Sequence, residues 1–66
     1  KEKLTITSKQ ILEEIIIFNP LGQQIKMFKV NFKTGQINIS DLKKGMYFLS
    51  LKGINGVQFS TKIFKE

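Results

Sequence analysis

The sequence predicts an all-β fold, and three observations support this prediction: its composition, its alternating apolar residues and the spacing of its turn signals. Its 66 residues include 10 Ile and 6 Phe, which favour strands, and no Ala, which is the best helix former. Short alternating segments recur at spacings of about 8–12 residues, as in small sandwiches and barrels. We therefore expect six or seven short antiparallel strands in a single domain that spans residues 1–66.

The first predicted strand, residues 3–7, alternates apolar with polar side chains. Residues 8–16 are the one segment in which a helix competes with a strand, because Ser8 is a suitable N-cap and the apolar residues that follow have helical spacing. The β-branched and aromatic run at residues 15–18 favours a strand instead, with a bulge near residues 12–14 at its start.

The first predicted turn spans residues 19–22. Asn19 suits the first position of such a turn, Pro20 fixes φ at the second, and Gly22 closes it. We therefore expect the chain to reverse direction here.

Three further connections separate the later strands: a turn at residues 33–35, an arch at residues 40–45 and a hairpin at residues 53–56. In the hairpin, the pair Asn55-Gly56 favours a type I′ turn, because both residues tolerate positive φ. The strand at residues 46–52 is the most hydrophobic of the later strands and is expected at the centre of the fold. These strands are predicted over residues 23–29, 36–39, 46–52 and 57–64.

Leu42, Gly45 and Tyr47 have the spacing of the tyrosine corner found in immunoglobulin-like sandwiches. In such a corner the Tyr hydroxyl donates a hydrogen bond to the backbone upstream and locks the crossover between two sheets. We therefore predict that these three residues, together with Gly22, determine the fold. The corner favours a small immunoglobulin-like β-sandwich with Greek-key topology over a closed barrel.

The charge balance is basic, with 11 basic and 5 acidic residues and a formal net charge of +6. All the basic residues are Lys, and they are spread along the chain. Arg, the preferred residue for bidentate contacts with bases and phosphates, is absent. We therefore predict no nucleic-acid partner.

Few residues are suited to catalysis or metal binding. The chain has no His and no Cys, so it lacks an imidazole base, a thiol nucleophile and the usual transition-metal ligands. We predict no catalytic residue, no metal, no cofactor and no enzymatic activity. The longest apolar run, residues 15–18, is far shorter than the roughly 20 residues of a membrane span. The chain begins at Lys1 rather than Met, which indicates a piece of a longer protein.

Four segments occur in a distinctive order: LTIT, IIIFNPLGQQIK, INISDLKKGMYFLSL and STKIFKE. In this order and spacing they resemble the type A C-terminal sorting domain of the type IX (Por) secretion system of Bacteroidota, nearly from end to end. One element departs from that pattern. Such domains carry a Pro-Asn-Pro element ahead of the first strand, whereas here the pair Asn19-Pro20 lies in a later turn. No cleavage site is therefore predicted within this chain.

The resemblance implies a non-enzymatic address label at the C-terminal end of a secreted protein, with the cargo on its N-terminal side. The implied partners are the outer-membrane translocon and shuttle components of type IX secretion and a sortase-like protease that removes the label. The implied location is the periplasm during transit, followed by the cell surface or the medium.

By analogy with the family, the terminal residues are the expected recognition element, because an edge strand is readily bound by addition of a partner strand. The alternative is a purely structural role, in which Ile63 and Phe64 only close the sandwich. A plain immunoglobulin-like adhesion or carbohydrate-binding module is the alternative function, and pairing of two chains through an exposed edge strand also stays open. The recognition residues are Lys62, Ile63, Phe64, Lys65 and Glu66.

Overall fold

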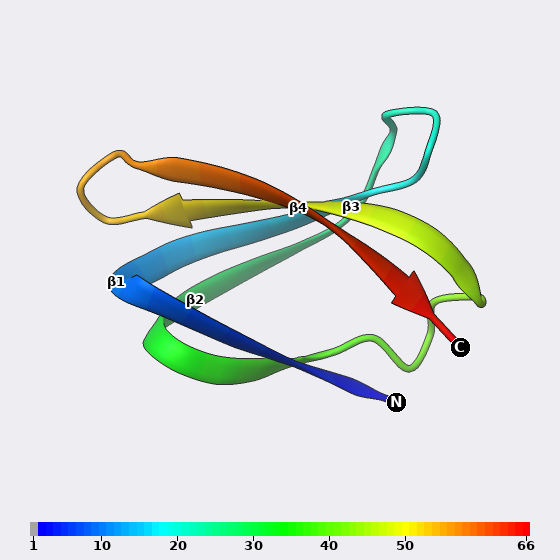
Figure 1. Ribbon diagram of the computed structural model, residues 1–66, viewed down its shortest axis with the longest axis horizontal. Helices are drawn as coiled ribbons and strands as arrows, with labels where there is room; N and C mark the ends of the chain where they lie inside the picture. The colour runs from blue at the N-terminus through cyan, green and yellow to red at the C-terminus, as the bar shows by residue number, and fades with distance from the viewer. Residues whose placement is uncertain (1) are drawn as a thin grey trace.

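Four antiparallel strands form one sheet in the computed structural model, which describes residues 2–66 (Figure 1). The strands lie in the order β2-β1-β3-β4, so β2 and β4 are the edges and β3 is interior, as expected of the most hydrophobic strand. The all-β prediction is confirmed, because every regular element of the described residues is a strand. The bounds are β1 Lys3–Phe18, β2 Gln24–Asn38, β3 Gly45–Gly53 and β4 Gln58–Lys65.

The prediction of six or seven short strands is not confirmed, because β1 and β2 each continue where two strands were expected. The strands predicted at residues 3–7 and 15–18 are the two ends of β1, and those at 23–29 and 36–39 fall in β2 except for their outermost residues, 23 and 39. Register shifts after Thr7 and at Leu12 bend the pair without ending it, as bulges do. The Greek-key topology is not confirmed either, since all four strands belong to one hydrogen-bonded sheet.

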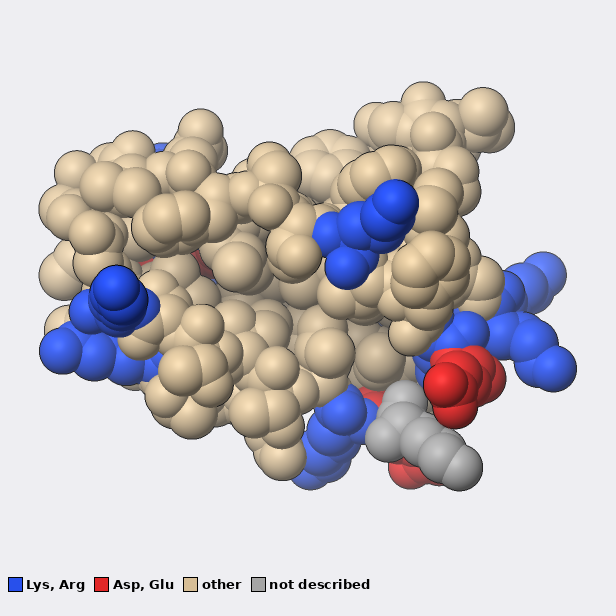
Figure 2. All heavy atoms as spheres, viewed as in Figure 1, with Lys and Arg blue, Asp and Glu red and all other residues tan. Residues whose placement is uncertain are grey.

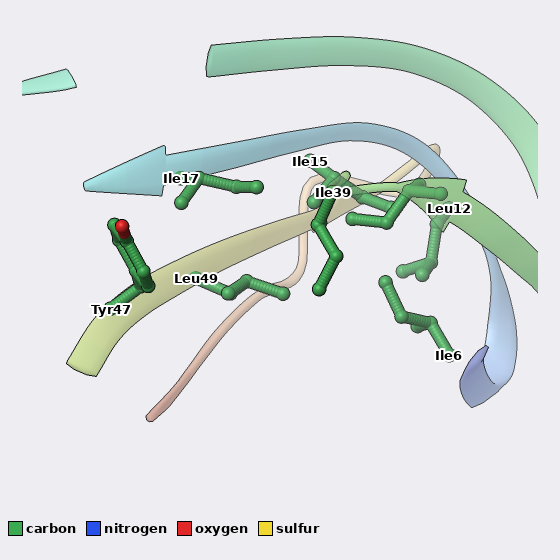
Figure 3. Close-up of a cluster of buried hydrophobic side chains, with 8 residues drawn as sticks. Ile6, Leu12, Ile15, Ile17, Ile39, Tyr47 and Leu49 are labelled. Atoms are coloured by element: carbon green, nitrogen blue, oxygen red, sulfur yellow. The ribbon is translucent and has the colours of Figure 1, made fainter. Parts of the chain in front are cut away.

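The bend folds one end of the β1–β2 hairpin back over the rest of the sheet (Figure 1). We call this end, residues 3–7 of β1 with residues 34–38 of β2, the N-terminal arm. Ile6 and Ile37 from the arm belong to the same buried cluster as Ile15, Ile17 and Leu49 of the main sheet. The side chains of this cluster point toward one another between the two layers (Figure 3).

Two local predictions near the start of the sheet have opposite outcomes. The helix considered for residues 8–16 does not form, because this segment lies within β1. The bulge expected near residues 12–14 is confirmed, since the register shifts between Leu12 and Glu14 in the pairing of β1 with both β2 and β3. This bulge keeps Leu12 and Ile15 fully buried although they are not separated by an even number of residues.

Two of the predicted turns differ from the structure, one in its existence and the other in its type. Residues 33–35 form no turn but continue β2 through the bend. At residues 53–56 the chain does turn, with the Gly56 N–H donating to the Gly53 carbonyl at 3.0 Å. It is not a type I′ turn, because no described residue other than glycine has positive φ and only Gly56, at +88°, is left-handed here. This pattern is typical of longer hairpin loops closed by a glycine bulge.

Gly35 lies at the bend of β2 because an aromatic ring occupies the space of a side chain. A Cβ at this position would lie 2.4–2.7 Å from ring atoms of Phe32. We expect Gly35→Ala to lower the free energy of unfolding by about 1–2 kcal/mol, because the ring must move out of a packed site. Chemical denaturation measures this loss. In a Phe32→Leu background the same substitution should cost much less, and an equal cost in both backgrounds would contradict the explanation.

Candidate functional site

The C-terminal strand divides the predicted recognition residues between two faces of the sheet. Ile63 pairs with Tyr47 and packs against the buried core. Lys62 and Phe64 pair with the outward-facing Phe48 and Met46 on the opposite face, because successive side chains of a strand alternate. Phe64 is 70% exposed. Ile63 therefore packs against the core, whereas Phe64 is open to solvent.

Lys65 is partly buried, and its ammonium group is bonded to the backbone of another segment. Its Nζ donates hydrogen bonds to the carbonyl oxygens of Ile39 at 2.7 Å, Leu42 at 2.7 Å and Ser40 at 3.2 Å. An ammonium group has three protons, so these bonds use its full donor capacity. We call this arrangement the lysine latch. It joins the end of β4 to the turn between β2 and β3.

The same turn is held by further contacts. The Asn38 side chain accepts a hydrogen bond from the Ser40 N–H at 2.8 Å, and Lys26 pairs with Asp41 at 2.8 Å. The hydrogen bond from Lys26 lowers the pKa of Asp41 below its ordinary value of 3.8, with a further contribution from the charge of Lys26. Any stabilisation from this pair is present at neutral pH and lost as the pH falls through the lowered pKa. Asp41 is solvent-exposed, so the pair contributes little.

Tyr47 makes the hydrogen bond that the tyrosine corner predicts. Its hydroxyl donates to the Lys43 carbonyl at 2.6 Å, and the residue is buried, with only 8% of its surface exposed. We expect Tyr47→Phe to lower the free energy of unfolding by about 1 kcal/mol, since the substitution leaves a partly buried carbonyl without its donor. Thermal denaturation checks this. Unchanged stability would mean that the corner bond does not contribute.

The other predicted fold-determining residues lie at the connections between strands. Gly22 has φ of +87° and Gly45 has φ of +145°, a range that residues with side chains rarely adopt. At residues 19–22 the Asn19 side chain accepts hydrogen bonds from two following N–H groups, which stabilises the predicted turn. Leu42 packs against the buried core from the turn before β3.

An exposed aromatic pair flanks a lysine on the outer face of β3 and β4. Phe48 lies directly opposite Lys62, and Phe64 lies two residues farther along β4 on the same face. We call Phe48, Lys62 and Phe64 the outer patch. Sequence reasoning missed Phe48, because only the register of the two strands brings it beside the other two residues. An outward position was visible in the alternation of residues 46–52.

Two kinds of feature are absent from the described residues: clusters of metal-ligating side chains and membrane-spanning helices. Within residues 2–66, no three His, Cys, Asp or Glu side chains lie close enough together to hold a metal ion. In the same part of the chain, no helix has the length and apolar character needed to cross a membrane.

Comparison with known proteins gives one family and one relative. A family model described as a secretion system C-terminal sorting domain matches residues 1–66. The curated protein beta-agarase A of Zobellia galactanivorans is 36% identical over 50 residues. These residues are 76% of this chain and 9% of the agarase, so the chain corresponds to less than a tenth of the length of that relative. No solved structure matches the chain.

Proposed function

The chain belongs to the family of secretion system C-terminal sorting domains, and from this premise we propose how its surface serves as a type IX sorting signal. The family is a sorting signal and not a catalytic domain. The observation that carries the assignment is the match to the family model over residues 1–66. Such a signal takes its cargo through the periplasm to the cell surface or the medium.

In this proposal, residues 1–66 form one domain at the C-terminal end of a longer secreted protein, with the cargo on the N-terminal side. The chain itself performs no catalysis. Its partners are the outer-membrane translocon and the shuttle components of type IX secretion, and a sortase-like protease removes it after transit. The tyrosine corner then has the role it has in immunoglobulin-like sandwiches, which is to fix the connection between two layers.

The outer patch, which β3 and the C-terminal strand form together, is the surface best placed to be recognised. Its two aromatic side chains are exposed, and aromatic residues are enriched at binding surfaces. Lys65 is a poor candidate for direct recognition, because its donors are used by the lysine latch. We therefore assign Lys62 and Phe64 to recognition, and Ile63 and Lys65 to holding the strand in place. Glu66 is exposed beyond the end of β4.

An export assay tests the proposed function. Residues 1–66 are fused to the C-terminus of a fluorescent reporter that carries its own signal for the periplasm, in a bacterium with type IX secretion. The fusion is expected at the cell surface or in the medium, and the reporter alone in the periplasm. Retention of a folded fusion in the periplasm would contradict the proposal.

Deleting residues 62–66 is a poor version of this assay. The deletion removes the exposed Phe64 together with the lysine latch, so it combines loss of recognition with loss of stability. Point substitutions on the two faces of β4 separate these effects, because the exposed residues and the latch face opposite sides.

A further inference from the structure

The inner face of the sheet is incompletely covered by the N-terminal arm. Burial of the inward-facing side chains decreases across the sheet: Ile15 and Ile17 on β1 are 0% exposed and Leu49 on β3 is 2% exposed, whereas Phe59 on β4 is 44% exposed. The arm supplies two strands, and the layer beneath it has four. The side of the sheet formed by β4 therefore lacks a covering strand.

A groove lies where this cover is missing. Two adjoining hollows that share Thr7 and Leu51, with volumes of about 350 and 400 Å3, form its two parts. One wall is the N-terminal end of β1, the floor is β3, and the other wall is the inner face of β4. From its open side the groove appears as a hollow below the β3–β4 hairpin (Figure 2). The residues of β3 and β4 that line it are Leu49, Leu51, Phe59, Thr61 and Ile63.

The wall formed by β1 is a free strand edge. Residues 4–7 line the groove consecutively. Since neighbouring side chains of a strand point to opposite faces, four successive residues line a hollow only when the strand presents its edge to it. These residues pair with β2 on one side, and the pairing of β1 with β3 on the other side begins only at Leu12.

The two walls lie farther apart than directly paired strands. Within the part of the chain that the structure describes, no Cα atom of β1 lies within 8 Å of a Cα atom of β4. Strands that flank a third strand lie about 9–10 Å apart, twice the spacing of paired strands. The walls are therefore not in direct contact, and the two hollows between them lie beside residues 4–7 and beside Leu51 and Phe59.

Charge decides between the candidate occupants of the groove. Lys9 is the only charged side chain among the residues that line its two parts. The whole chain carries a net charge of +6, which disfavours a second copy of the same chain by like-charge repulsion. An acidic segment is attracted both by Lys9 and by the overall charge.

We propose that the groove between the N-terminal end of β1 and β4 binds one extended, acidic strand of a partner protein. The strand adds to the free edge at residues 4–7 and completes the layer that covers β4. This site lies on the face opposite the outer patch, so the proposal does not depend on recognition through Phe48, Lys62 and Phe64. The groove and the outer patch are two separate binding surfaces.

A titration followed by NMR tests the proposal. The probe is an acetylated, amidated peptide of about eight residues in which Val alternates with Glu, long enough to form one strand. Saturable shifts are expected at the amides of residues 4–7 and 59–63 of the labelled chain, and they should weaken as salt is added. Methylation of alternate backbone nitrogens removes the N–H donors along one edge of the peptide, so the methylated peptide should not bind in any register that uses those donors. A version with Lys in place of Glu should bind less tightly.

Two variants with the same change of charge locate the site. Phe59→Glu places a carboxylate in the groove and should weaken binding about tenfold by repulsion and lost apolar contact. Met27→Glu makes the same change on the outer face of β2, where the native residue is 47% exposed, and should leave the affinity unchanged. The dispersion of the amide spectrum shows that each variant is folded.

Several results would overturn the proposal. They are the absence of saturable shifts at millimolar peptide, shifts confined to the outer patch, and equal weakening by both variants. Groove amides that shift as the protein alone is concentrated would show that a second copy fills the site. Groove amides already shifted in the longer parent protein would show that another segment of the same chain fills it.

Discussion

Replacing Lys65 by Met is expected to lower the free energy of unfolding by about 2–3 kcal/mol, the largest stability effect among the single substitutions considered. The substitution keeps most of the aliphatic stem and removes the ammonium group that bonds three carbonyls. Hydrogen bonds to a charged group contribute about 1.5–3 kcal/mol each when desolvated. The ammonium group of Lys65 is partly exposed, so its three hydrogen bonds together contribute less than three times this value. Chemical denaturation followed by circular dichroism measures the loss.

Lys62→Met is the matched control for this substitution. It removes the same charge from the same strand, three residues earlier, where the side chain is exposed. Exposed substitutions usually change stability by no more than about 0.5 kcal/mol. If Lys65→Met were as mild as Lys62→Met, the lysine latch would not hold the strand.

Replacing both Phe48 and Phe64 by Thr is expected to reduce export of a fused reporter about tenfold while leaving the domain folded. Aromatic anchors at the centre of an interface contribute most of its binding energy, so their loss should weaken recognition strongly. Thr is chosen because it keeps the strand propensity of the two sites. The surface and periplasmic fractions of the reporter are measured together with the melting temperature of the isolated domain.

The control for the outer patch changes exposed apolar residues elsewhere. Leu21 and Ile54 lie in two turns and are 85% and 59% exposed. Changing both to Thr removes comparable apolar surface without touching β4, and export should be unaffected. Normal export of the Phe48 and Phe64 variant, or equal loss in both double variants, would contradict the assignment of recognition to the outer patch.

Features that depend on near neighbours in the sequence were predictable. The bond from Tyr47 to Lys43 spans four residues and the turn at Asn19 spans four, so the residue types and their spacing were sufficient. The bulge at residues 12–14 followed from the apolar spacing around it. The strand count was wrong because bulges bend a strand without ending its pairing, and alternation alone does not distinguish a bend from a turn.

Features that depend on distant parts of the chain were not predictable from the sequence. Lys65 bonds carbonyls that precede it by 23 to 26 residues, and residue type alone does not distinguish it from the other Lys residues. The outer patch needs the register of β3 against β4, which places Phe48 opposite Lys62. A shift of one residue would have turned Phe64 inward and Lys65 outward, reversing their roles.

The most direct test of the sorting function is the fraction of a reporter fused to residues 1–66 that leaves the periplasm, compared between a strain with type IX secretion and the same strain without its translocon. We predict export in the first strain and complete retention of a folded, intact fusion in the second. Retention in both strains would show that the domain is not a sufficient sorting signal. Export in both would show that the fusion leaves by another route, and either result would contradict the proposed function.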